Sequence, residues 1–114
     1  MKNKNQQLIL SLLSTSPVAF NPDLARLTSS VKTGLFLSQL LYWSDRGSDE
    51  EWIYKTICEF EEETSLSRRE QDGAIKKLKS LKILEVKLKG VPAKRHFHVD
   101  IDQLIELMEK YYSM

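Results

Sequence analysis

Residues 64–81, TSLSRREQDGAIKKLKSL, place side chains that can pair with base edges at the start of an expected helix. Arg68 and Arg69 can each form a two-bond fork with guanine, and Gln71 can do so with adenine. Side chains near the N-terminus of a helix reach base edges when the helix lies in the major groove. The expected DNA-contacting positions of this helix are Ser67, Arg68, Arg69, Gln71, Asp72 and Lys76.

Two residues of this helix fit DNA contact less well. Asp72 would repel phosphate, and an ion pair with Lys76, four residues later, is expected to offset this. Gly73 lies in the middle of the helix, where glycine costs about 1 kcal/mol relative to alanine. Either a backbone approaches closely there or the position is simply tolerated. The alternative for the whole helix is a solvated basic face on a packing helix.

A second basic set falls on an expected β-hairpin at residues 84–99. The segment LEVKLKG alternates between apolar and charged residues, which is typical of a half-buried strand. GVPAK then predicts a turn and RHFHV a returning strand. Cations here are expected to touch phosphate or to enter the minor groove. The expected contacts are Lys87, Lys89, Lys94, Arg95 and His96.

The charge is distributed unevenly along the chain, although the net charge is only +1. Residues 45–64 carry eight acidic and two basic residues, whereas residues 67–98 carry ten basic and three acidic ones. A basic block of this kind is typical of a nucleic-acid-binding face. The alternative is a polarised surface without a ligand.

The aromatic residues are expected mostly in the core. The alternative is a platform on which bases of single-stranded DNA stack, and Trp52 and Tyr54 are its candidates because they share one strand face. His96 and His98 form an H-x-H pair, but a metal site needs further ligands and Cys58 is the one soft candidate. No metal or cofactor is therefore expected.

No catalytic signature is present in the sequence. There is no G-x-S-x-G, no glycine-rich phosphate loop and no H-E-x-x-H. The acidic cluster at residues 59–63 is expected to be a solvated helix face, because side chains on one helix splay around its axis. The chain is therefore not expected to be an enzyme.

The elements that would position these residues follow from local patterns. Thr56 with Glu59, and Ser67 with Glu70, have capping-box spacing and predict two helix starts. Asp100 is expected to cap a last helix. The expected order is a helix ending before Pro17, a short helix opened by NPD at 21–23, an apolar helix from Ser29 or Ser30 through Trp43, a strand EWIYK at 51–55, a helix-turn-helix at 56–82, a wing at 84–99 and a C-terminal helix at 100–112.

This order predicts one domain over residues 1–114. Its class is α+β, mainly α: a single winged helix-turn-helix with a three-stranded antiparallel sheet and flanking N- and C-terminal helices. The apolar stripe of the last helix could close its own core or pair with a second copy, so a homodimer is a candidate state. The stripe comprises Ile101, Leu104, Ile105, Met108, Tyr111 and Tyr112.

Several segments resemble the winged-helix domain of replication initiators and replisome organisers of phages, plasmids and integrated mobile elements. The resemblance covers roughly residues 18–105. Its most specific parts are LLYWSDR, W-x-Y-K-T, EEETSLSRREQD, KLKGVPAK and HFHVD. It implies a DNA-binding module used at a replication origin or within a primosome-like assembly, with the second helix and the wing as contact surfaces. Longer family members carry further segments after the winged helix, which favours an accessory protein or a lone binding domain here.

Composition and the resemblance together set the expected partners. Duplex DNA is favoured, single-stranded DNA is the alternative, and a replication protein is a further candidate. A transcriptional regulator of the same fold, or a protein-interaction module that docks through acidic segments, are the alternative functions. The longest early apolar run, residues 8–13, is too short for a secretion signal or a membrane span, and Cys58 cannot form an internal disulfide. A cytoplasmic location is therefore expected.

Overall fold

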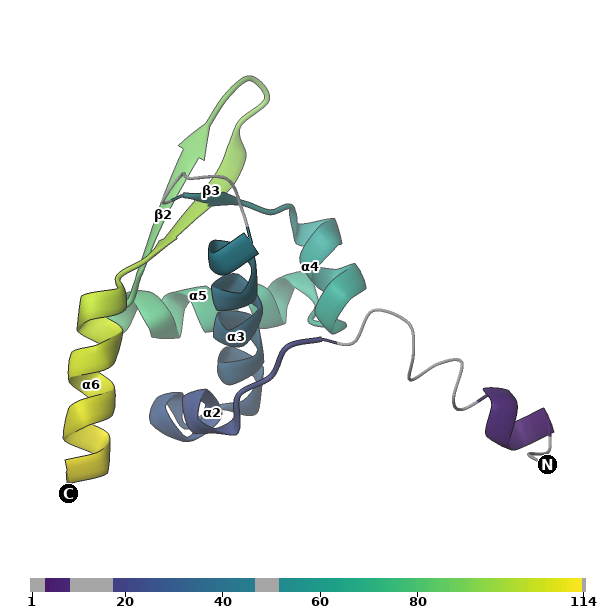
Figure 1. Cartoon of the computed structure of the whole chain (residues 1–114). Helices are drawn as coiled ribbons and strands as arrows, with labels where there is room; N and C mark the ends of the chain where they lie inside the picture. Colours follow the sequence, from purple (N-terminus) through teal and green to yellow (C-terminus); the bar gives the residue numbers. More distant parts are fainter. Residues whose placement is uncertain (1–3, 9–17, 47–51, 114) are drawn as a thin grey trace.

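Three antiparallel strands and a larger set of helices form the structure, a computed structural model that describes residues 4–8, 18–46 and 52–113 (Figure 1). It is an α+β fold and is mainly helical. Residues 4–8 are helical and exposed, and the apolar positions predicted at 9–13 lie outside the described residues. None of the described helices is long and apolar enough to cross a membrane.

Helix α2, Pro22–Thr28, begins as the NPD segment predicts. The side chain of Asn21 accepts a hydrogen bond from the backbone nitrogen of Asp23, and proline occupies the first turn. Ser29 follows in the left-handed conformation, which ends the helix. The next helix then starts at Val31, so α2 and α3 form a closely packed pair.

Helix α3, Val31–Arg46, is the centre of the core. Phe36, Leu37 and Leu40 are completely buried, which confirms the expected central position of this apolar helix. It packs against α2 and α5 (Figure 1). A Cβ atom at Gly34 would lie 2.5 Å from the Cα of Ala25, so the close approach of α2 requires glycine at this position.

Helices α4, Ile57–Thr64, and α5, Arg68–Ser80, are joined by a three-residue turn. Both predicted capping boxes are confirmed. The side chains of Thr56 and Ser67 accept hydrogen bonds from the third backbone nitrogen of their helices, and the glutamates at those positions return the contact. The start of α5 is thereby fixed next to the end of α4.

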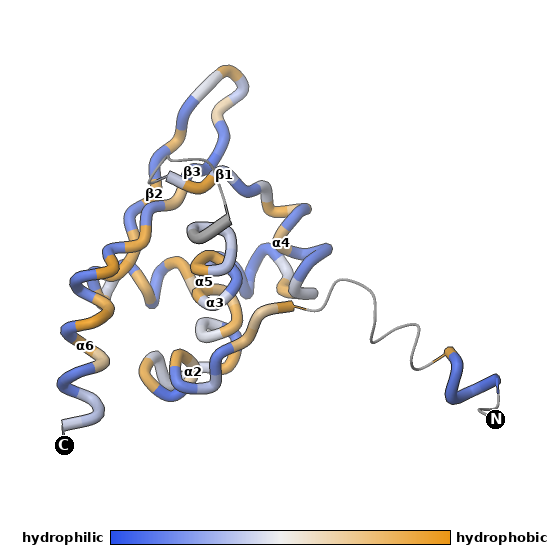
Figure 2. The backbone as a smooth tube through the Cα atoms, in the orientation of Figure 1, coloured by the Kyte–Doolittle hydropathy of each residue, from blue (hydrophilic) through white to orange (hydrophobic). Residues whose placement is uncertain are grey.

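The sheet has the strand order β1-β3-β2 and is antiparallel throughout. Its strands are β1, Ile53–Tyr54, β2, Leu84–Lys89, and β3, Lys94–Val99. Blue and orange alternate along β2 in Figure 2, as the sequence predicts for a half-buried strand, whereas β3 starts with three hydrophilic residues, 94–96, and alternates only after them. Phe97 of β3 is fully buried and lies opposite both Ile53 and Val86. The strand expected at 51–55 is shorter than predicted, because Lys55 turns inward and Thr56 already caps α4.

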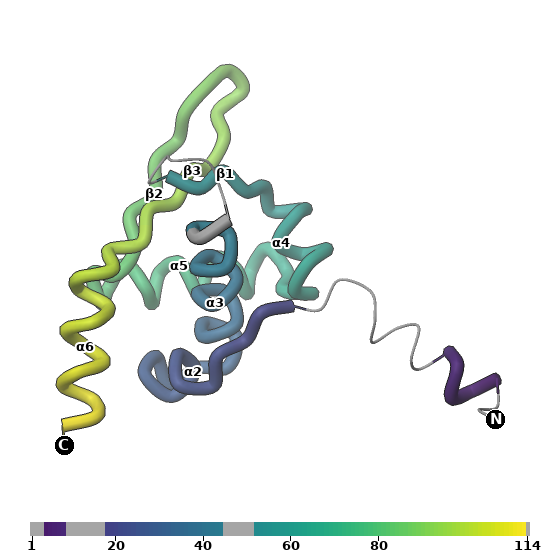
Figure 3. Tube along the Cα trace, viewed as in Figure 1, coloured from purple at the N-terminus to yellow at the C-terminus, as the bar shows by residue number. Residues whose placement is uncertain are grey.

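Helix α6, Ile101–Ser113, follows β3 directly (Figure 3). The side chain of Asp100 accepts a hydrogen bond from the backbone nitrogen of Gln103, which confirms the predicted cap. The predicted apolar stripe is only partly covered. Leu104 is buried and Met108 packs against the core, whereas the remaining members of the stripe are exposed. These exposed residues are Ile101, Ile105, Tyr111 and Tyr112.

Candidate nucleic-acid interface

The outward face of α5 carries two of the predicted cations. Ala74 and Leu78 are buried against the core, so the stripe on the opposite side of the helix faces solvent. Arg69 and Lys76 lie on that stripe, one turn or more apart, and Gly73 lies between them. A Cβ atom at Gly73 would meet no other atom within 4 Å. Among the described residues, no backbone of another element approaches there, so the glycine is tolerated rather than required by packing.

Gln71 does not belong to the exposed face, and its predicted role at a base edge is wrong. The side chain is completely buried, and Nε2 donates to the carbonyl oxygens of Ile57 and Leu66 at 3.0 and 2.9 Å. Its Oε1 accepts a hydrogen bond from Arg95 at 3.3 Å. Because a buried polar group must be hydrogen-bonded, the amide serves to join the helix pair instead of contacting a ligand.

Asp72 pairs with arginines and not with Lys76 as predicted. Its carboxylate lies 3.3 Å from the guanidinium of Arg95 and 4.0 Å from that of Arg68. The Arg95 side chain is only 18% exposed, and its burial lowers the pKa of the guanidinium while Asp72 opposes this shift. Arg95 therefore holds the hairpin against α5, and the expectation that it contacts phosphate freely is not met.

A hollow of about 430 Å³ lies between α5 and the β2–β3 hairpin. Lys76 and Lys79 line it from the helix, and Val86 and Leu88 line it from β2. Asp72, Ile75 and Arg95 complete its lining, so apolar, cationic and acidic groups all border it. A second hollow, of about 360 Å³, is lined by Arg68 of α5 together with Tyr54, Lys94 and Arg95. The helix and the hairpin therefore border both hollows.

The opposite flank of α5 carries the predicted Ser67 and the acidic Glu70. The hydroxyl of Ser67 is occupied by the helix cap, so it acts as a positioning residue. Glu70 pairs with Lys32 at 2.8 Å. The hydrogen bond from Lys32, and then those from Ser67, lower the pKa of Glu70 from 4.5 to about 2. Glu70 is therefore ionised at neutral pH, and the positive charge of Lys32 offsets its negative charge.

The remaining predicted cations of the hairpin face the other side of the sheet. Strand residues alternate between the two faces, and Phe97 and Val99 point into the core. The alternate side chains of β2 and β3 point outward, where His98 and Lys87 lie beside Trp52, and His96 lies beside Tyr54. The structure thus divides the predicted hairpin set between two faces. The outward members are Lys87, Lys89, Lys94 and His96.

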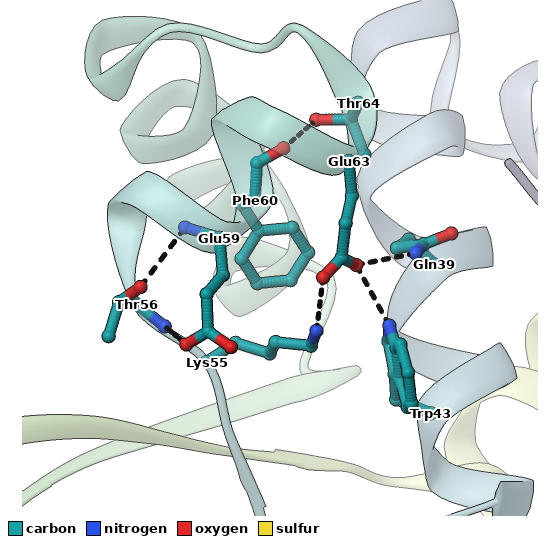
Figure 4. Close-up of polar contacts among 8 residues, drawn as sticks. All are labelled: Gln39, Trp43, Lys55, Thr56, Glu59, Phe60, Glu63 and Thr64. Carbon is teal, nitrogen blue, oxygen red and sulfur yellow. Dashed lines mark hydrogen bonds and ion pairs between the residues drawn. The ribbon is translucent and has the colours of Figure 1, made fainter. Parts of the chain in front are cut away.

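A partly buried acidic centre that the sequence did not reveal fixes α4 (Figure 4). The carboxylate of Glu63 accepts hydrogen bonds from Gln39 Nε2 at 2.6 Å, from Trp43 Nε1 at 2.9 Å and from the ammonium of Lys55. Burial alone would raise the pKa of Glu63, but the three donors outweigh it and lower the pKa. The prediction of a solvated face for this glutamate is wrong, because it points toward α3.

The other acids of α4 divide into structural and exposed residues. Glu59 belongs to the capping box, while Glu61 and Glu62 are exposed. Within the described ranges, no three His, Cys, Asp or Glu side chains come together in a way that could hold a metal ion. Cys58 is exposed on α4. Glu61 and Glu62 are therefore the two acidic residues of α4 that an external partner could contact.

Comparisons of the chain with protein-family models, with curated proteins and with solved structures return no match.

Proposed function

We propose that this chain is a winged helix-turn-helix domain that binds duplex DNA and catalyses no reaction. In this proposal α4 and α5 are the helix-turn-helix and the β2–β3 hairpin is the wing. The observation that carries it is the exposed stripe of Arg69 and Lys76 on α5, next to the hollow whose far wall is the hairpin. A helix of this width fits the major groove, which admits one α-helix.

In this proposal, different residues along α5 contact bases and phosphates. Arg69 lies in the first turn, where a side chain can reach a base edge. Lys76 lies two turns later and is placed to contact phosphate, as is Arg68 at the flank. Gln71, Asp72 and Arg95 hold helix and hairpin in register for this contact. The internal hydrogen-bonded set therefore positions the surface and does not itself read DNA.

Binding of duplex DNA by single-residue variants tests the proposal. Replacing Lys76 by alanine should weaken binding to every duplex and reduce the slope of log affinity against log salt concentration by about one unit. Arg69→Ala should relax sequence preference, because one good base contact discriminates by about 1–3 kcal/mol. Lys110→Ala on α6 is the matched control, since this lysine is exposed but far along the chain from α5. Unchanged affinity and preference in both α5 variants would refute the groove assignment.

A role in replication of a phage, plasmid or integrated mobile element is part of the proposal and rests on the sequence resemblance. Footprinting over the host element tests it: protection at an origin supports this role, and protection confined to promoters supports a transcriptional regulator. A second copy packed on the exposed face of α6 is also proposed. Sedimentation velocity of the chain and of Ile105→Glu checks this homodimer, because Ile105 is exposed on that face.

A further inference from the structure

The outer face of the sheet gathers aromatic rings and cations from three strands. Trp52 and Tyr54 flank the buried Ile53, so both point away from the core. The ring of His98 lies 5.2 Å from that of Trp52, and the ring of His96 lies 5.3 Å from that of Tyr54. The planes of the two pairs are tilted by 36° and 34°. The four rings therefore form two neighbouring tilted pairs.

Three lysines surround these rings. The ammonium of Lys87 lies 4.4 Å from the centre of the Trp52 ring and that of Lys89 lies 5.4 Å from it, while the ammonium of Lys94 lies 5.2 Å from the centre of the Tyr54 ring. Across the part of the chain that the structure describes, none of the three forms an ion pair with a carboxylate. Their charge is therefore available to an anionic ligand.

We propose that this outer sheet face binds single-stranded nucleic acid, through residues other than those of the duplex-binding face of α5, although Tyr54 and Lys94 also line the hollow of about 360 Å³ that Arg68 borders. Unpaired bases would stack on Tyr54 and Trp52, and Lys87, Lys89 and Lys94 would contact the phosphates between them. Aromatic side chains next to a row of cations suit a single strand because every base has a face that can stack. Duplex DNA hides those faces, so it cannot use the rings in the same way.

The chemistry of the face favours a nucleic acid over an acidic peptide. The lysines alone would attract any polyanion, but carboxylate side chains gain nothing from the exposed faces of the rings. Lys87 lies over Trp52 by a cation–π contact. The flexible side chain can move from the ring to a phosphate, which exposes the ring to an incoming base. Tyr54 is 39% exposed, which makes it the most exposed of the four rings.

Anisotropy titrations of labelled oligothymidylate of about 12 nucleotides, within the site sizes of such surfaces, test this site. Tyr54→Ala should weaken binding of the single strand by about fivefold or more, because one stacked base is lost. Tyr54→Phe should retain it. Phe20→Ala, ahead of α2, is the control, since Phe20 is also an exposed aromatic residue. The affinity of each folded variant for duplex DNA should stay within about twofold of the wild type.

Tryptophan fluorescence gives a second readout that a general charge effect does not move. Oligothymidylate should quench the fluorescence of the chain, and Trp52→Phe should remove most of the quenching, because Trp43 is hydrogen-bonded internally to Glu63. Polyglutamate should cause no quenching. Equal binding of polyglutamate and oligothymidylate, or full affinity for oligothymidylate in Tyr54→Ala, would overturn the proposal. Arg69→Ala tests duplex binding by α5, so a loss of duplex binding in that variant neither supports nor contradicts single-strand binding by the sheet.

Discussion

Among single residues, Glu63 holds α4 in place through three hydrogen-bonded partners. It joins α4 to α3 through Gln39 and Trp43 and to the end of β1 through Lys55, which is only 6% exposed. Replacing Glu63 by glutamine keeps the shape but leaves the ammonium of Lys55 without its counter-charge. Such a loss costs about 3 kcal/mol when the partner is buried. Urea unfolding should show the midpoint of Glu63→Gln shifted to lower concentration.

The control for this change is Glu62→Gln, one residue earlier on the exposed side of α4. Its free energy of unfolding should stay within about 0.5 kcal/mol of the wild type, since exposed substitutions away from special contacts have small effects. Equal destabilisation by both variants would show that helix charge, and not the buried centre, is what matters.

Glu70 predicts how stability depends on pH. Its pKa is about 2 in the folded chain against 4.5 ordinarily, mainly because Lys32 and the Ser67 cap favour the carboxylate. A lowered pKa stabilises the fold fully above the ordinary value, and the contribution is lost as pH falls from about 4.5 toward about 2. The difference in unfolding free energy between wild type and Glu70→Gln should therefore shrink over that range. A constant difference down to pH 2 would contradict the assignment.

The two residues predicted wrongly to be exposed, Gln71 and Glu63, have hydrogen-bond partners far away in the sequence. Gln71 was expected at a base edge because of its type and position, but its amide binds Ile57 and Leu66 across the helix turn and Arg95 across the hairpin. Glu63 looked like one of several solvated acids because its partner Gln39 is 24 residues earlier. Helix periodicity assigns a face, but it carries no information about which distant donor lies opposite.

At the scale of elements, local patterns were sufficient. The capping boxes at Thr56 and Ser67 depend on residues three apart, and both helices start where they predict. The alternation of residues 84–89 depends on neighbours two apart, and β2 has these bounds. The order of the strands could not be predicted in this way. A three-stranded sheet was expected, but the pairing of β1 with β3 joins residues more than forty positions apart, and no local pattern predicts it.

Two glycines of neighbouring helices should respond in opposite ways to alanine. At Gly34 the new methyl group would collide with the backbone of Ala25, so overpacking should cost about 1–3 kcal/mol. At Gly73 the site is open and helical, so alanine should stabilise the chain by about 0.5–1 kcal/mol. Thermal unfolding followed by circular dichroism measures both. A lower melting temperature for Gly73→Ala would mean that another group occupies the space next to this position.

For the whole molecule, the sheet separates two surfaces with different chemistry. One side presents α5 with Arg69 and Lys76 and the hollow next to the hairpin. The other presents Trp52 and Tyr54 among lysines. The uneven charge of the sequence predicts that residues 67–98 form a basic block, but not that the sheet divides it. That division follows from strand alternation combined with the position of α5 on one face.

The most direct test of the central claim is the affinity of the unmodified chain for duplex DNA, measured by fluorescence anisotropy over a series of salt concentrations. Each phosphate contact contributes about −0.9 to the slope of log affinity against log salt. With Arg68 and Lys76 exposed on α5 and contacting phosphate, the slope should be about −2 or steeper. Absence of duplex binding at low salt, or an affinity that does not change with salt, would contradict the proposed function.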